Sequence, residues 1–386
     1  MTRTSASENT YVCMSVCCQI AMLFFELLRI SVGAARSFSH IPSSSEWVVM
    51  YNVAGKQTLI GVCFAGVQRL CDEQPEMVAN LPDDLKLKWI ANAVGIQQRN
   101  ELIDRRCVEL QTKLSVAGFR TYIMKGQGNA AIYGGELGTL RQPGDIDIFL
   151  DGGYKRVIDY VNSTFPTRDV NELEIHYHCF RDVEVEIHYH PFIMRDPFKN
   201  SRLQKFFEAE KERCFEHKIE LPSGAGDITV PTPCFNLVHQ LIHIRHHLYT
   251  EGIGLRQLMD YYFVLLDIHA RHADTSKAKI VVQELGLERF AEALMWVLQE
   301  VLALDASAVL WVSNPADGRM ILDEVVRSGN FGRADEQRGC LNSRWRSFWL
   351  VNGKAFRFAR FDRWAWLWTP LWRLWHFGWR KIHGYR

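Results

Sequence analysis

The chain has 386 residues, with 45 basic and 44 acidic side chains and a formal net charge of +1. This balance gives no electrostatic indication of a nucleic-acid partner, and the length predicts two or three domains or subdomains with a large core. The ten cysteines include no Cys-x-x-Cys pair, so we interpret them as reduced thiols of a cytoplasmic protein.

Helical patterns fill the first 118 residues. An apolar run over residues 11–28 is similar to a secretory signal, but Glu26 closes it and its amino-terminal side has no net positive charge, so we expect an amphipathic or buried helix. Ser43 and Glu46 have the spacing of a capping box, and a long helical pattern covers residues 82–117. No run reaches the ~18 uninterrupted apolar residues of a membrane span. This region carries no chemical motif, and we expect it to pack against the rest of the protein.

A glycine turn follows the first predicted strand, residues 120–124. Gly126 lets the backbone turn sharply, and the short helix after it would direct free N–H groups at an anion. Lys125 either adds positive charge there or is a solvated lysine at the end of the strand. The glycines at 134, 135 and 138 predict a flexible link that delivers Arg141. Arg141 would either contact a triphosphate through its forked donors or form a salt bridge that positions the next strand.

Asp145 and Asp147 alternate with Ile146 and Ile148 in the next predicted strand. Alternate side chains of a strand share a face, so both carboxylates point the same way while the isoleucines point into the core. Two carboxylates this close repel each other unless a cation lies between them, and Mg²⁺ prefers oxygen ligands of this kind. The pattern predicts a metal site; the alternative is a strand end with two solvated acids.

Two acidic and aromatic strands, residues 172–180 and 183–190, are predicted to pair as a hairpin. The second strand has one polar face, made of Glu184, Glu186, His188 and His190. Beside the two aspartates this face would add a third carboxylate, from Glu186 or Glu184. Alternatively, the two strands would form a zinc site, since zinc favours histidine ligands. Its candidate ligands are His176, His178, His188 and His190.

Residues 197–330 are predicted to form a helical bundle that lines a cleft. The helix over 234–249 carries four histidines on one side, His239, His243, His246 and His247. They would form a polar wall of the cleft or would be ordinary packed and surface residues. In the next predicted helix, Arg256 and Asp260 are four residues apart and could simply pair with each other.

The tail, residues 331–386, has a composition of its own. From residue 341 onward it holds eight of the twelve tryptophans and a single acid, Asp362. Thr369 and Pro370 predict the start of a short helix. This composition suits packing onto the protein or contact with a partner, and also peripheral binding at a membrane surface or stacking on nucleic-acid bases.

The ordered set of motifs resembles the nucleotidyltransferase fold of the DNA polymerase beta superfamily. That fold has a glycine turn opening a helix, Asp-x-Asp on a strand and a third carboxylate on a later strand. More narrowly, the chain resembles a bacterial group of uncharacterised nucleotidyltransferases, up to about residue 270. The matching motifs are Lys125-Gly126, Arg141 to Asp147, Val185-Glu186-Ile187-His188, and Leu255-Arg256 to Asp260. The resemblance implies an α+β fold, with a mixed β-sheet core over residues 119–196 between helical regions.

The activity that this resemblance implies is transfer of a nucleoside monophosphate from an NTP such as ATP to an acceptor hydroxyl. Two Mg²⁺ ions would be held by Asp145, Asp147 and Glu186, and the nucleotide by Lys125, Gly126, Gln127 and Arg141. The remaining residues expected in the cleft are Glu184, His188, His243, Arg256 and Asp260. A sugar, another small molecule, RNA or protein would fit as acceptor.

Two other classes of function remain open from the sequence. Gln127 stands where the resembled fold has a small residue, and the third acid is a glutamate, which is compatible with a non-catalytic nucleotide-binding or scaffold protein. The histidine-rich strands are compatible with a zinc-dependent hydrolase. Pyrophosphate release that depends on Mg²⁺ would distinguish the first class, and metal analysis the second.

Overall fold

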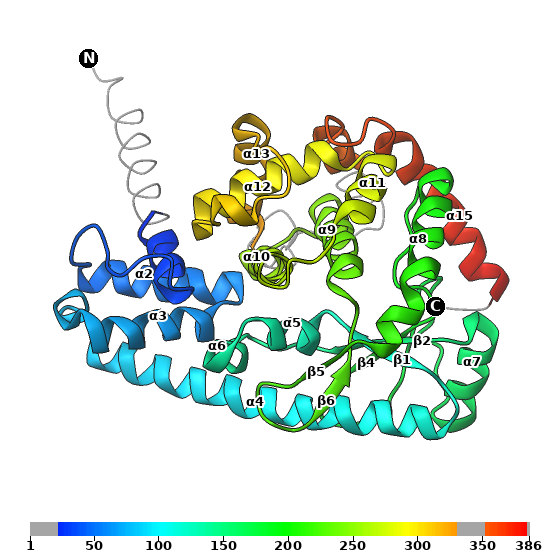
Figure 1. Ribbon diagram of the computed structural model, residues 1–386, viewed down its shortest axis with the longest axis horizontal. Helices are drawn as coiled ribbons and strands as arrows, with labels where there is room; N and C mark the ends of the chain where they lie inside the picture. The colour runs from blue at the N-terminus through cyan, green and yellow to red at the C-terminus, as the bar shows by residue number, and fades with distance from the viewer. Residues whose placement is uncertain (1–21, 330–351, 384–386) are drawn as a thin grey trace, which may run out of the picture.

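The computed structural model describes residues 22–329 and 352–383 and shows an α+β protein (Figure 1). A small mixed sheet lies between a long helix on one side and a bundle of helices on the other. This arrangement confirms the predicted fold class. Most of the apolar run over 11–28, and the tail from 330 to 351, lie outside the described residues.

The amino-terminal region is helical, as predicted. Its elements after the first described helix are α2 (Ser44–Gln57), α3 (Ile60–Glu73), the short 3₁₀ helix η1 (Pro75–Val78) and α4 (Asp83–Val116). The capping box is confirmed, because the Ser43 side chain accepts from the Glu46 amide and the Glu46 carboxylate accepts from the Ser43 amide.

This region packs directly on the rest of the molecule. Gly61 of α3 lies so close to α6 that an added Cβ would be 2.2 Å from the carbonyl oxygen of Leu140. Trp47 and Phe24 belong to the same hydrophobic core as Phe235 of the bundle. The expected packing role of the first 118 residues is therefore confirmed for their described part.

The sheet has four strands. In spatial order they are β1 (Thr121–Met124), β2 (Ile146–Leu150), β4 (Val185–His188) and β3 (Glu174–His176). β2 pairs antiparallel with β1 and parallel with β4, and β3 pairs antiparallel with β4. The hairpin predicted over 172–190 is therefore confirmed, with shorter strands.

The connection between β1 and β2 is more ordered than the glycines predict. It forms two short helices, α5 (Gly126–Ile132) and α6 (Gly135–Leu140). An added Cβ at Gly138 would lie 2.5 Å from the carbonyl oxygen of Ala130. The absence of a side chain there lets α5 and α6 approach each other, so Gly138 serves close packing and the expected flexible link is wrong.

The two faces of the sheet pack against different helices. Ile123, Ile148 and Ile187 belong to a core shared with α4 and α7 (Gly153–Thr164). On the other face the ring of Tyr122 packs against Phe235 in the bundle. The even-numbered and odd-numbered residues of β2 thus face opposite layers, and its aspartate face is turned toward the bundle (Figure 1).

The bundle follows the sheet in the chain. Its elements are α8 (Pro197–Glu216), α9 (Pro233–Tyr249), α10 (Leu255–Ala270), α11 (Ser276–Glu284), α12 (Glu288–Leu302), η2 (Ala306–Ala308) and α13 (Pro315–Ser328). A small hairpin, β5 (Lys218–Glu220) with β6 (Asp227–Thr229), was not predicted, because strands of three residues leave little periodicity to detect. The helix α15 (Ala365–His383) begins before Thr369 and Pro370, so they do not mark its start.

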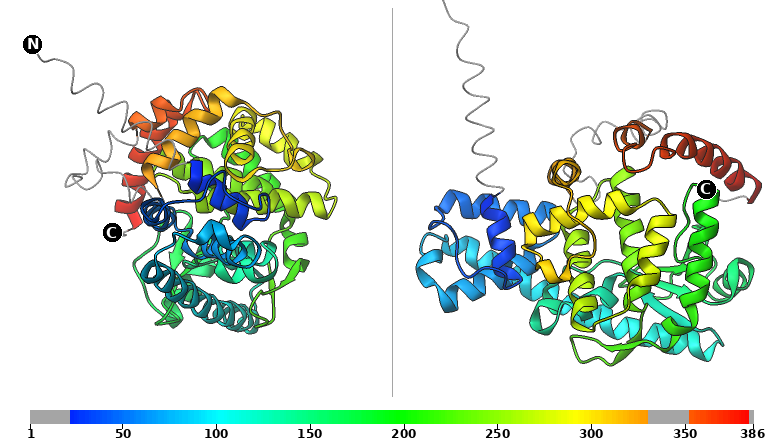
Figure 2. Two further views of the ribbon diagram at one scale, coloured as in Figure 1. Left: turned by 90° about the vertical axis from the view of Figure 1, so that its left-hand side faces the viewer. Right: turned by 45° about the horizontal axis from the view of Figure 1, so that its top comes forward.

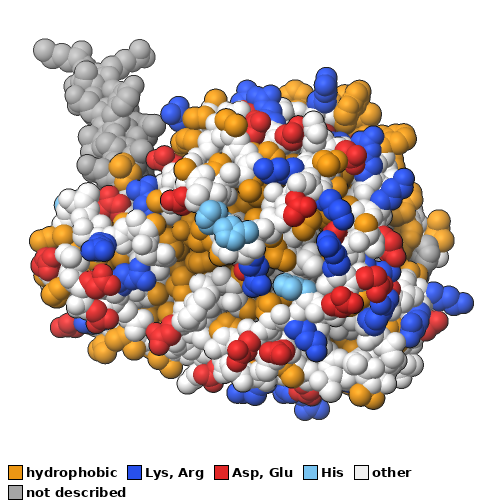
Figure 3. All heavy atoms as spheres, in the orientation of Figure 1, with side chains coloured by type: hydrophobic (Ala, Val, Ile, Leu, Met, Phe, Trp, Pro, Cys, Tyr) orange, Lys and Arg blue, Asp and Glu red, His pale blue; other side chains and the backbone are white. Residues whose placement is uncertain are grey.

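The described helices of the two ends lie far apart. Figure 2 shows α15 on the outside of the molecule, and Figure 1 shows the amino-terminal helices at the other end of its long axis. Figure 3 shows acidic and basic side chains interspersed over one face, which agrees with the small net charge. Within residues 22–329 and 352–383, no helix is long and apolar enough to cross a membrane.

Candidate active site

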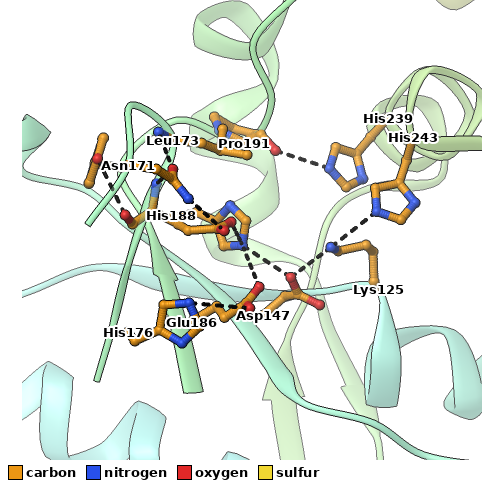
Figure 4. A network of polar contacts seen from close by, with 12 residues as sticks. Lys125, Asp147, Asn171, Leu173, His176, Glu186, His188, Pro191, His239 and His243 are labelled. Carbon is orange, nitrogen blue, oxygen red and sulfur yellow. Dashed lines mark hydrogen bonds and ion pairs between the residues drawn. The ribbon is translucent and has the colours of Figure 1, made fainter. Parts of the chain in front are cut away.

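The parallel pairing of β2 with β4 brings two acidic residues together. Asp147 lies directly opposite Glu186 in the ladder, 39 residues apart in sequence but on adjacent strands. Phe149 is opposite His188 in the same way, and both acids lie on the face turned toward the bundle (Figure 4). Register alone therefore places the second predicted aspartate beside the predicted glutamate.

Asp147, Glu186 and His188 form a compact group of possible metal ligands. One ligand atom of each lies within 4.8 Å of the others. His188 Nε2 is 3.0 Å from Asp147 Oδ1 and 3.2 Å from Glu174 Oε2. Glu174 also belongs to a second such group with His176 and Glu186. These donors, mostly carboxylate oxygens, suit a divalent cation.

The charge of this group is unevenly balanced. Burial, followed by the negative charges of Asp147, Glu174 and Asp145, raises the pKa of Glu186 to about 9. Burial also acts to raise the pKa of Asp147, but Lys125 and His188 outweigh it and hold that pKa well below its usual value. The site therefore carries more buried negative charge than its own cations balance.

Asp145 occupies a different position from the one expected. Its side chain lines the same cleft but is exposed, and it is not part of the compact groups. The charge of Asp147 and then burial raise its pKa. Asp145 and Asp147 thus face one cleft, as predicted, with Asp145 at the solvent side and His188 within the group.

Lys125 lies against the acidic group. Its Nζ is 2.6 Å from Asp147 Oδ1 and 3.3 Å from His243 Nε2 on α9 (Figure 4). The residue has φ +49°, and Gly126 has φ +39°, so the chain reverses sharply before α5. Lys125 is therefore a site residue rather than a solvated lysine.

Gln127 turns away from the cleft. Its amide Nε2 donates to Asn100 Oδ1 at 3.3 Å and also to Asp104 on α4. The side chain is 2% exposed and is not among the residues that line the cleft. The side chain of Gln127 therefore has no access to a ligand in the cleft and instead ties α5 to the long helix, so only its backbone amide stays a candidate for the expected nucleotide contact.

Arg141 and Asp260 form a buried two-point ion pair. Arg141 Nε and Nη2 lie 2.7 Å and 2.8 Å from the two carboxylate oxygens, and Tyr133 donates to the same carboxylate at 2.7 Å. Arg256 instead donates to the carbonyl of Gln142 at 3.1 Å. Of the two alternatives for Arg256 and Asp260, the pair within their helix is not formed, because Arg141 reaches that carboxylate from the α6–β2 link. Both residues line the cleft instead.

Both guanidinium groups keep a buried nitrogen without a partner. These are Nη1 of Arg141 and Nε of Arg256, and both residues line the cleft. A buried donor without an acceptor is costly. Two such donors at one cleft favour an anionic ligand with several oxygens.

We expect Asp260→Asn to lower the free energy of unfolding by about 3–5 kcal/mol, because it leaves the buried guanidinium of Arg141 without its counter-charge. The matched control is Asp267→Asn on the same helix. Asp267 pairs with the half-exposed Arg271 at 2.6 Å, and its loss should cost less than about 1 kcal/mol. Urea unfolding measures both values, and equal losses would contradict the structural importance of the Arg141–Asp260 pair.

The histidines of α9 form a neutral wall of the cleft. His239 Nε2 is 3.2 Å from the carbonyl oxygen of Pro191, and His243 Nε2 is 3.0 Å from His247 Nε2. Burial and then the Lys125 charge lower the pKa of His239 to about 3 and hold that of His243 well below its usual value. The expected polar wall is therefore present, and the imidazoles of His239 and His243 are uncharged.

The strand histidines do not converge on one point. His178 is exposed, and His190 lines a separate groove against α8. His176 and His188 are the two that join carboxylates. The four-histidine zinc site proposed from the sequence is therefore not formed.

The acidic group, Lys125, the two arginines and the histidines of α9 surround one cleft of about 350 Å³. Of the residues predicted from the sequence, those that line it are Lys125, Gly126, Arg141, Asp145, Asp147, Glu186, His188, His239, His243, His246, His247, Arg256 and Asp260. Glu184 does not: its side chain is exposed, and its backbone oxygen accepts from Ile146 at 2.9 Å. Sequence reasoning missed Glu174, although its alternation with His176 on a strand was a usable signal.

A family model described as an uncharacterised nucleotidyltransferase matches residues 43–303. The chain belongs to this family. The match includes every residue of the cleft and most of the amino-terminal helices, so the region that packs on the core is part of the family's common structure.

Other likenesses of this nucleotidyltransferase are weak. The crystal structure of an antigenic nucleotidyltransferase-like protein from Paracoccidioides brasiliensis is 10% identical, and the match covers 57% of this chain and 97% of that chain with a TM-score of 0.31. A likeness of this strength does not bear on the site. No curated protein matches the chain.

Proposed function

We propose that this nucleotidyltransferase moves a nucleoside monophosphate from an NTP to a hydroxyl group of an acceptor, and that the reaction takes place in the cleft. Family membership supports nucleotidyl transfer in general. The observation that carries the proposal is the β2–β4 register, which sets Asp147 beside Glu186 in a cleft that also holds Lys125 and two arginines.

The acidic group is suited to divalent cations. Asp147 and Glu186 would hold them, with Asp145 at the cleft mouth and Glu174 as further oxygen donors. Two Mg²⁺ ions bound here would neutralise the triphosphate and favour ionisation of the acceptor hydroxyl. His188 donates to the carboxylates and fixes their orientation.

The cationic side chains supply the site for the triphosphate. The free Nη1 of Arg141 and Nε of Arg256 would donate to phosphate oxygens, and Asp260 keeps the first guanidinium in place. Lys125 adds a positive charge between this part of the cleft and Asp147. In this proposal the basic residues bind the phosphates, and the acidic residues hold the cations and activate the acceptor.

The chemical step balances without a further reactant. The acceptor oxygen attacks the α-phosphorus, the bond from that phosphorus to the bridging oxygen of the β-phosphate breaks, and pyrophosphate leaves. Glu186 would take the acceptor proton once bound cations offset the neighbouring negative charges that raise its pKa. The sugar, small-molecule, RNA and protein acceptors all present such a hydroxyl.

The test uses each NTP labelled at either the α- or the γ-phosphate, incubated with the purified protein, Mg²⁺ and a cell extract. We expect label from the α-position to appear on an acceptor, with pyrophosphate released. Transfer of the γ-label would show a kinase instead. Saturable NTP binding without transfer of either label would show a non-catalytic nucleotide-binding protein.

A further inference from the structure

The helix α15 is attached to the body along one face. The side chain of Thr369 is buried and accepts from Arg195 at 3.3 Å, and that guanidinium lies over the ring of Trp372 at 5.3 Å. His376 Nε2 is 2.8 Å from a carboxylate oxygen of Glu172. Because these residues recur every three or four positions, they define an inner face of the helix.

The opposite face of α15 is apolar and open to solvent. Its large exposed side chains are Trp366, Leu371, Leu374, Trp375, Phe377 and Ile382. Leu374 is 67% exposed and Ile382 is 82% exposed. A helix that is hydrophobic on both faces is normally covered on both. An exposed apolar face of this kind marks an interaction surface.

Exposed large hydrophobic side chains are concentrated at this end of the described chain. Of the 20 large hydrophobic residues exposed in the described part of the protein, seven lie between Trp364 and Ile382. They include the three exposed tryptophans found there, Trp364, Trp366 and Trp375. Tryptophan is the side chain that most favours the interface between water and lipid, because its ring is apolar and its N–H can still be hydrated.

The positive charge of this segment favours an anionic partner over a second copy of the chain. From Arg363 to the end of the chain the sequence contains basic residues and no Asp or Glu. Arg363, two residues before α15, and Lys381 on it are exposed. A second copy packed face to face would bring these like charges together, which is unfavourable. Negatively charged lipid headgroups would instead attract them.

We propose that α15 binds flat against the surface of an anionic lipid bilayer, with its outer apolar side chains among the headgroups and its basic side chains on lipid phosphates. The inner face stays attached to Phe198 of α8, to Arg195 and to Glu172, so the rest of the protein would be held at the membrane without a spanning helix. This proposal does not depend on the reaction carried out in the cleft.

The test measures co-sedimentation of the full-length protein with vesicles. One set contains phosphatidylcholine alone and the other phosphatidylcholine mixed with phosphatidylglycerol. We expect tighter binding to the mixed vesicles, and weakening by salt, which screens the charge contribution. Lack of binding to the mixed vesicles would overturn the proposal.

Two sets of variants distinguish the contribution of the apolar side chains to vesicle binding from that of the charged side chains. Leu371→Ala with Leu374→Ala and Phe377→Ala should weaken binding more than about tenfold, because three exposed apolar side chains lose their buried area. Arg363→Gln with Lys381→Gln should weaken it about fivefold per charge removed, and only for the mixed vesicles.

The matched control replaces equally exposed apolar residues elsewhere: Leu87→Ala, Val116→Ala and Val312→Ala. It should bind vesicles as the unchanged protein does. Equal binding by the helix variant and the control would overturn the proposal. So would a dimer in gel filtration that the helix variant converts to a monomer without any change in vesicle binding, since the face would then cover a second copy.

Discussion

Asp145→Asn combined with Asp147→Asn is expected to reduce turnover at least about a thousandfold, because a loss of about 4 kcal/mol of metal-dependent stabilisation has that effect. Asparagine keeps the shape of each side chain but removes the charge that would hold the cations. The measurement is the initial rate of pyrophosphate release with Mg²⁺ and the labelled NTP. Unchanged turnover would refute the assignment of the acidic group.

The two single variants should differ in stability, although both should lose activity. Asp145 is exposed, so its replacement should change the free energy of unfolding by no more than about 0.5 kcal/mol. Asp147 is 4% exposed and ion-paired with Lys125 at 2.6 Å, so its replacement leaves a buried ammonium unpaired and should cost about 3 kcal/mol. The sequence alone suggests no such difference.

A control variant next to β2 distinguishes a defect of the site from a defect of the strand's folding. Asp151 directly follows β2 and pairs with Arg120 and Lys211 outside the cleft. Asp151→Asn makes the same chemical change and should leave turnover within about twofold, since it contacts nothing in the cleft. A comparable loss in this variant would indicate damage to the fold rather than to the reaction.

Glu186→Gln is expected to lower the rate at saturating NTP by at least about a hundredfold, because loss of a positioned proton acceptor has effects of that size. Glu184→Gln is its matched control, two residues earlier on the same chain segment. Its side chain is exposed and does not line the cleft, so its rate should stay within about twofold.

The outcome of this pair tests the register of the sheet as well as the chemistry. If β4 were shifted by two residues, Glu184 would stand opposite Asp147 and the ranking of the two variants would reverse. The measured ranking therefore distinguishes the observed register from its nearest alternative that keeps the same face inward. Retained binding of the NTP by Glu186→Gln would separate a defect in the chemical step from a loss of the site.

Much of the fold could be predicted from the sequence, because it depends on local physics. The alternation of Asp145 and Asp147 with isoleucines indicated a strand with one polar face, and the Ser43–Glu46 spacing indicated a capped helix. Such patterns act through neighbours two to four residues away, so they can be recognised in the chain itself.

Several parts of the site were decided only by long-range packing. The spacing of Arg256 and Asp260 left open a pair within their helix, but Arg141, 119 residues away, takes the Asp260 carboxylate. The sequence did not show where the Gln127 side chain points, and α4 offers it buried acceptors. A side chain with several possible partners takes the one that packing places nearest, and sequence spacing does not determine that choice.

The sequence by itself determined the four strands of the main sheet, most of the helices and the groups available for chemistry: carboxylates on a strand, a glycine turn and basic residues, in a family of nucleotidyltransferases. Only the tertiary structure decided which of these groups meet. The parallel β2–β4 register places Glu186 beside Asp147 and leaves Glu184 outside, and α9 supplies neutral histidines opposite Lys125. Pairing between strands distant in the chain is fixed by the packing of the whole core, which no local pattern encodes.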